Sequence, residues 1–187
     1  MRPQLCVLLI AIALSLACEA GNRSALDPQS LTPEQKSAVE GAVRGFMQAV
    51  AGDVTGQGPT AWKKHFADDP AFFMANDGRL VFPNTQAADQ GIEAFARTIK
   101  HIELHWGDDL RVDVLTPKLA LVGTSWSEIQ IDNSDHQVNE GGFFTGLVEY
   151  RGESRGEDRS GHWQFRDAHW SSIPAPVPPA ARPAKTK

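Results

Sequence analysis

Apolar residues first recur at helical spacing shortly after residue 30. Thr32 is placed as an N-cap, Pro33 occupies the first helical position, and Gln35 completes a capping box. One apolar stripe then follows at i, i+4, i+7, i+8 and i+11: Val39, Val43, Phe46, Met47 and Val50. The pattern predicts a core-facing helix that begins after Thr32 and ends near Gly52.

A short second helix and a hairpin are predicted next. Trp62 and Phe66 stand four residues apart, which places both on one face of a helical turn. Residues 71–82 then carry two apolar runs on either side of Asp77 and Gly78. This pair is typical of a tight turn in which both central residues have positive φ, so the segment predicts a β-hairpin.

The remaining pattern predicts a third helix and then strands only. Asp89 can cap this helix, whose apolar stripe is Ile92, Phe95, Ala96 and Ile99. The expected strands are separated by turn-forming residues and span 109–115, 118–131, 138–151 and 162–172. Helices followed by a run of strands predict an α+β fold with helices on one face of a sheet.

The last strand has a polar end on one of its faces. Alternate positions share a face of a strand, and here they are Trp163, Phe165, Asp167, His169 and Ser171. This face begins apolar and ends polar, as expected of a strand that packs under helices and then opens into a cavity. We therefore expect His169 to face that cavity.

This closing strand and the segment 142–146, GFFTG, resemble SnoaL-like domains of the nuclear transport factor 2-like superfamily. The resemblance spans residues 32–172. It implies a cone-shaped α+β fold, with three N-terminal helices packed on a curved, mostly antiparallel sheet, and a pocket inside the cone. It also implies a homodimer formed through the sheet.

Composition and charge limit the function. The sequence is 41% hydrophobic and 22% charged, as in ordinary globular proteins, and its formal charge is −5. Nucleic-acid binding needs a basic patch on the folded part, and none is visible, so a nucleic-acid partner is not expected.

The N-terminus predicts export. Residues 1–20 combine Arg2 with an uncharged apolar run, as in a signal peptide of a bacterial protein. Cys18 follows a segment similar to a lipobox, so one outcome is a lipidated Cys18 that tethers the protein to a membrane. Cleavage after Ala17 or Ala20 is the other, and the expected location is the periplasm or a membrane-anchored lipoprotein.

The domain is expected to lie between two polar extensions. Residues 21–31 have the small, polar composition of a linker, and residues 173–187 are rich in proline, as in a disordered tail. The only cysteines are Cys6 and Cys18, both within the first 20 residues. A thiol nucleophile is therefore not expected in the domain.

Two groups of polar residues are candidates for chemistry. His169, assisted by Asp167 on the same predicted face, can act as a general base, but a pocket-wall or dimer-interface role is the alternative. His101, Glu103 and His105 share a face if their segment is extended, but no further ligand motif accompanies them. We expect neither a metal nor another cofactor.

The expected function is binding of a small apolar or partly polar molecule, without turnover. Four residues are expected to contact it: Trp62, Phe66, Trp126 and His169. Because relatives include polyketide cyclases and ketosteroid isomerase, acid–base catalysis on a carbonyl compound is one alternative. The only tyrosine, Tyr150, lies on a strand, so the helix-borne tyrosine of ketosteroid isomerase has no counterpart.

A second alternative is an oligomerisation module, similar to the association domain of calcium/calmodulin-dependent kinase. The sequence leaves all three functions open. An ionisable group buried deep in the cone would favour the enzyme.

Overall fold

The computed structural model describes residues 31–152 and 161–173. The predicted signal peptide, Cys18, most of the linker and the tail after residue 173 lie outside these residues. None of the helices in the described ranges is long and apolar enough to cross a membrane.

Helix α1 (Pro33–Gln57) begins as predicted, with Thr32 as N-cap in a complete capping box with Gln35. It extends past Gly52, where the sequence predicted its end, because Val54 continues the buried stripe. Gly58 ends the helix at φ 81°, a conformation that favours glycine, and its N–H donates to the Val54 carbonyl.

Two shorter helices follow. η1 (Pro59–His65) is a 3₁₀ helix, and α2 (Thr85–Ala96) is α-helical. Asn84 caps α2 by accepting from the N–H of Ala87, so the prediction of Asp89 as the cap is wrong. A sequence pattern locates a helix better than it locates its ends, because Asn84 and Asp89 are both residue types that cap.

Seven strands form one sheet in the order β2-β1-β7-β6-β5-β3, with β4 also paired to β5. The predicted hairpin is β1 (Phe73–Asn76) and β2 (Arg79–Phe82), and its turn residues Asp77 and Gly78 both have positive φ. The other strands are β3 (Ile99–Trp106), β4 (Arg111–Thr116), β5 (Leu119–Asp132), β6 (Gln137–Arg151) and β7 (His162–Ser172).

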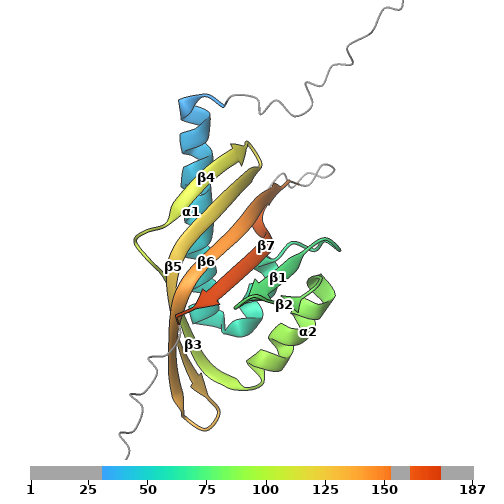
Figure 1. Ribbon diagram of the computed structural model, residues 1–187, viewed down its shortest axis with the longest axis vertical. Helices are drawn as coiled ribbons and strands as arrows, with labels where there is room; N and C mark the ends of the chain where they lie inside the picture. The colour runs from blue at the N-terminus through green and yellow to red at the C-terminus, as the bar shows by residue number, and fades with distance from the viewer. Residues whose placement is uncertain (1–30, 153–160, 174–187) are drawn as a thin grey trace, which may run out of the picture. The chain divides into compact units, whose positions relative to one another are not determined.

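Strand β3 was not predicted as a strand, and Ile99 belongs to it rather than to the third helix. All strand pairs are antiparallel except β1 with β7. In Figure 1, α1 lies behind β4, β5 and β6, and α2 lies beside the β1–β2 hairpin. Helices on one face of a curved, mostly antiparallel sheet confirm the predicted α+β class.

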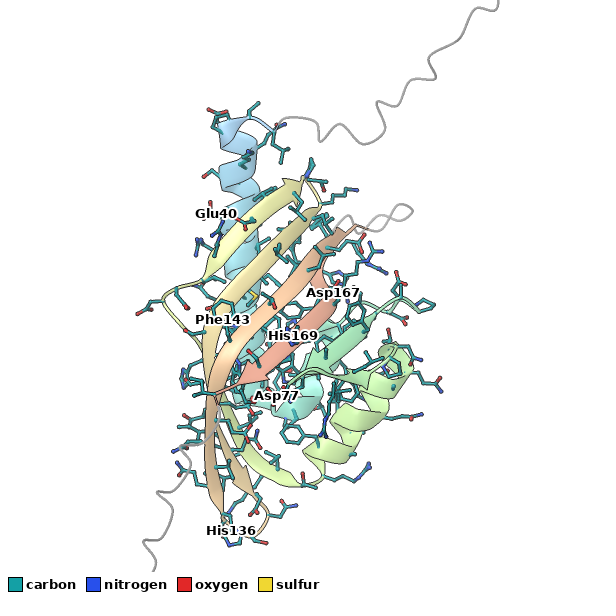
Figure 2. All side chains as sticks on the ribbon, viewed as in Figure 1. Glu40, Asp77, His136, Phe143, Asp167 and His169 are labelled. Carbon is teal, nitrogen blue, oxygen red and sulfur yellow. The ribbon has the colours of Figure 1, made fainter. Side chains whose placement is uncertain are left out.

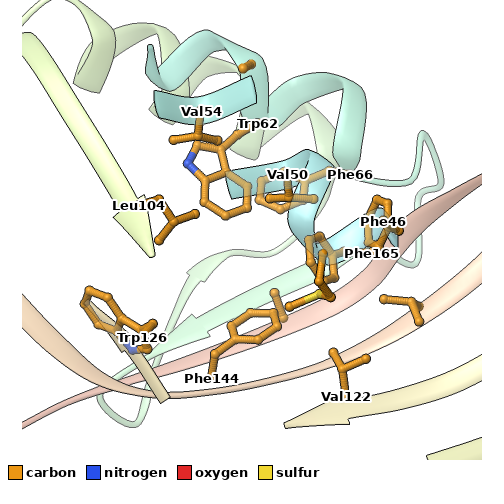
Figure 3. Close-up of a cluster of buried hydrophobic side chains, with 14 of the residues drawn as sticks. Phe46, Val50, Val54, Trp62, Phe66, Leu104, Val122, Trp126, Phe144 and Phe165 are labelled. Carbon is orange, nitrogen blue, oxygen red and sulfur yellow. The ribbon is translucent and has the colours of Figure 1, made fainter. Parts of the chain in front are cut away.

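The core lies between α1, η1 and the inner face of the sheet. Phe144 and Phe165 are fully buried on the strand side and belong to the same buried cluster as Val50 and Val54 of α1 (Figure 3). On β5, buried side chains alternate along the strand, at Ala120, Val122, Thr124, Trp126 and Glu128. The last of these, Glu128, carries a carboxyl group.

Candidate functional site

A cavity of about 340 Å³ lies between α2, the β1–β2 hairpin and one end of the sheet. Most of its wall is aromatic or aliphatic, from Trp62, Phe66, Met74, Phe82, Ile92, Phe95, Trp126 and Trp170. Its polar lining consists of Asn76, Glu128, Gln130, Glu140 and Ser172. A mainly apolar wall with few polar groups is the usual form of a small-molecule site.

Three of the four predicted pocket residues line this cavity. Trp62 and Phe66 stand on the helix side, and Trp126 faces them from β5 (Figure 3). Each is no more than 8% exposed. Their helical and strand spacing positions them here, while their part in ligand binding stays a prediction.

His169 lies elsewhere, which corrects the expectation that it lines the cavity. Its side chain is exposed and pairs in the sheet with Thr145, on the face opposite α1 (Figure 2). Asp167 does not line the cavity either. Its carboxylate accepts from the backbone N–H of Leu147 at 3.2 Å, and burial raises the pKa of this group.

A β-bulge at Arg166 causes the difference. Val148 pairs with Phe165, but the adjacent Leu147 pairs with Asp167, so Arg166 is one extra residue in β7. An extra residue turns every later side chain to the other face of the sheet. Strict alternation before and after the bulge therefore places Phe165 and Trp170 inside and His169 outside.

The buried carboxyl group of the cavity is that of Glu128, which was not singled out from the sequence. Glu128 is 9% exposed and lies between Leu104 of β3 and Glu140 of β6 in the sheet. Burial raises the pKa of Glu128 to about 7, with a further contribution from Glu140, while a hydrogen bond from Gln130 opposes the shift. The Gln130 Nε2 atom donates to Glu128 Oε1 at 2.5 Å.

A pKa near neutrality lets one carboxyl group exist in both protonation states at physiological pH. The signal for Glu128 was present in the sequence. It continues the inward alternation of β5 two residues after Trp126, at a position where an apolar residue would be expected.

Two residues that line the cavity each have a polar atom that is buried without a hydrogen-bond partner. These atoms are the donor Trp126 Nε1 and the acceptor Asn76 Oδ1. Leaving such a group unpaired costs about 1–3 kcal/mol, so a ligand that pairs with it recovers that free energy. The residues of this aromatic wall thus include an unpaired donor, an unpaired acceptor and a titratable carboxyl group.

A second hollow of about 530 Å³ lies between α1, η1 and the start of β7. There the Asp53 carboxylate accepts from Lys64 Nζ and from His65 Nε2, each at 2.9 Å. Burial lowers the pKa of His65, and Asp53 opposes that shift. Because Asp53 is already paired twice, this cluster is explained by the packing of η1 on α1.

The other predicted ligand group stays on the surface. His101, Glu103 and His105 share the outer face of β3, where His101 Nε2 contacts Glu103 Oε1 at 2.9 Å. Within the described residues, no group of three or more His, Cys, Asp or Glu side chains is arranged to hold a metal ion.

Solved structures of known proteins share this fold. A nuclear transport factor 2-like superfamily protein from Salmonella enterica aligns at a TM-score of 0.60 and 11% identity, over 79% of this chain and 99% of that one. A protein described as a candidate scytalone dehydratase from Novosphingobium aromaticivorans aligns at 0.61 and 12%, over 82% and 99%. A type 2 hexachlorocyclohexane dehydrochlorinase aligns at 0.55 and 11%, over 79% and 99%.

No protein-family model matches the sequence, and no curated protein matches it. At these identities the structural likeness shows the fold alone. The chain therefore has a nuclear transport factor 2-like fold, which confirms the fold expected from the closing strand and the 142–146 segment.

Proposed function

We propose that the chain binds a small, mainly apolar molecule in the aromatic cavity and that Glu128 transfers a proton to or from it. The observation that carries this proposal is the position of Glu128, an ionisable side chain 9% exposed inside an apolar cavity. Its pKa of about 7 suits both a general acid and a general base. Glu128 takes the role that the sequence suggested for His169 and Asp167.

Binding without turnover is the second candidate function. The unpaired Trp126 Nε1 and Asn76 Oδ1 support it, because both are suited to orienting a ligand and neither transfers a proton. The two functions share one cavity and differ only in what Glu128 does. A probe reaction that requires nothing but a base in an apolar site separates them.

Nitrobenzisoxazole is such a probe, since it is planar, neutral and ring-opened by proton removal. The base takes the C–H proton, the freed electron pair forms a nitrile, and the N–O bond breaks to release a coloured phenolate. We expect the wild type to be faster than Glu128→Gln by on the order of 10²-fold. The wild-type rate should rise with pH around the pKa of Glu128, about 7.

Glu103→Gln is the matched control, because it removes a carboxylate from the outer face of β3 and leaves the cavity unchanged. Thermal melting of each variant checks that it is folded. If the wild type and Glu128→Gln react at the same rate, Glu128 is not the base, and binding without turnover is favoured.

We also propose that two copies associate through the outer face of the sheet. Leu121 and Leu147 are cross-strand partners there, and the exposed Phe143 ring covers Gly123. Export of the chain, with or without a lipid on Cys18, stays a prediction from residues 1–20.

A further inference from the structure

The charged side chains of the cavity wall are all acidic. Glu128 of β5 and Glu140 of β6 are cross-strand partners, and both line the cavity. Among the described residues that line it, none is lysine, arginine or histidine. A ligand that enters this cavity therefore meets negative charge without a basic side chain to balance it.

The aromatic residues of the wall stand at right angles to one another. The ring of Trp170 meets that of Trp126 at 5.0 Å and 85°, and that of Trp62 at 5.6 Å and 88°. All three tryptophans line the cavity, and the face of an indole is the negative part of its quadrupole. An organic cation that contacts an indole face is therefore attracted to it.

The polar atoms fit the same kind of ligand. Asn76 Oδ1 is buried and needs a donor, which an ammonium group supplies. Trp126 is 8% exposed and its unpaired Nε1 needs an acceptor, so a carbonyl, ether or hydroxyl oxygen elsewhere on the ligand suits it. An anionic ligand would instead be repelled by the two carboxyl groups of the wall, Glu128 and Glu140.

From the two carboxyl groups, the three tryptophans of the wall and the unpaired Asn76 acceptor, we propose that the ligand of this cavity is an organic cation. Its chemical class is a protonated amine that carries an apolar, ring-sized body. This inference rests on the proposed function, because it names the substrate class of the same cavity. Glu128, once ionised, is the counter-ion of the bound ammonium group.

Three compounds that differ only in the head group test the inference. They are phenethylamine, phenethyl alcohol and phenylacetate, which are cationic, neutral and anionic at neutral pH. Isothermal titration calorimetry should give the amine at least about tenfold higher affinity than the alcohol, since buried charge pairs and cation–π contacts favour it. Phenylacetate should bind more weakly than either.

Glu128→Gln should reduce the preference for the amine while leaving the affinity for the alcohol nearly unchanged. Glu103→Gln, which changes charge outside the cavity, should keep the wild-type preference. In the wild type the amine should bind more tightly as the pH rises past the pKa of Glu128, about 7. Glu140 is the other titratable side chain that lines the cavity, so the same titrations on Glu140→Gln measure its contribution to the amine preference.

Equal or tighter binding of the alcohol or of phenylacetate would overturn the inference, as would the absence of measurable amine binding at millimolar concentration. The outcome is independent of the base test, because nitrobenzisoxazole is neutral. Base catalysis without amine preference leaves the proposed function standing and removes only the cation. Amine preference without base catalysis would support the organic cation as ligand and contradict proton transfer by Glu128.

Discussion

At the scale of single residues, the titration of Glu128 is expected to make the stability of the fold depend on pH. Its pKa is raised from 4.5 to about 7 in the folded chain, so the folded state binds more protons than the unfolded state between those values. The free energy of unfolding contributed by this group therefore falls as the pH rises through that range, by about 3 kcal/mol in total.

Chemical denaturation of the wild type and of Glu128→Gln at several pH values measures this contribution. The difference between the two free energies of unfolding separates the contribution of Glu128 from those of other titrating groups. That contribution includes the repulsion between Glu128 and its cross-strand neighbour Glu140. We expect the wild type to lose stability relative to Glu128→Gln from about pH 5 to pH 8. A constant difference would mean that Glu128 is solvated like an ordinary carboxylate.

For His169 we expect a substitution to have no effect on ligand binding. Because it is exposed on the outer face, His169→Ala should leave the affinity for any cavity ligand, such as phenethylamine, unchanged. The same titration on Trp126→Leu should lose affinity, since Trp126 is buried and lines the cavity. Loss of affinity in His169→Ala would mean that the outer face communicates with the cavity.

The two residues also mark the limit of sequence analysis. Trp62, Phe66 and Trp126 line the cavity, while their contact with a ligand stays a prediction. Strand alternation failed for His169, because the bulge at Arg166 depends on pairing with β6, which the sequence of β7 alone does not contain. The sequence shows Glu128 at an inward position of β5, but only the structure shows that its carboxyl group is buried in a cavity.

At the scale of elements, local signals were reliable and boundaries were not. The capping box at Thr32 and the turn at Asp77 were predicted because each depends on a few adjacent residues. Strand β3 was missed, because its outer face carries the polar residues His101, Glu103 and His105 and only Ile102, Leu104 and Trp106 turn inward. Pairing with β5 decides its conformation.

Two glycines with open surroundings allow a direct test of backbone conformation. An added Cβ at Gly78 or at Gly41 meets no atom within 4 Å, so only the backbone responds to alanine. Gly78 has φ 74°, and Gly78→Ala should cost about 1–2 kcal/mol. Gly41 lies in α1, and Gly41→Ala should instead stabilise by up to about 1 kcal/mol.

Thermal or chemical unfolding of the two variants beside the wild type gives both values, and each variant is the other's control. Stabilisation by Gly78→Ala would mean that the hairpin turn adopts another conformation in solution. The same result for both glycines would point to a general effect of alanine on the unfolded chain.

At the scale of the whole molecule, the fold is shared with proteins that are 11–12% identical, so the fold alone does not define a function. The proposed function depends instead on the lining of the cavity. The outer face of the sheet combines exposed apolar side chains with charges of both signs, which suits it to the proposed dimer interface. Arg111 and Asp113 of β4 share that face with Leu121.

A twofold axis would bring this face against its own copy, so that the exposed apolar residues of the two copies meet. Phe143 is the largest exposed apolar side chain of the patch, at 47% exposure. We expect the wild type to sediment as a dimer and Phe143→Glu as a monomer, because a charge in the centre of an apolar interface is left unpaired.

Leu80→Glu is the matched control, since Leu80 is 62% exposed but belongs to β2, at the far edge of the sheet from β4 and β5. It should remain a dimer. Both variants should keep the wild-type affinity for phenethylamine, because the cavity opens on the inner side of the sheet and neither residue lines it. A wild type that sediments as a monomer contradicts the proposed interface but leaves the cavity and its predicted ligand unaffected.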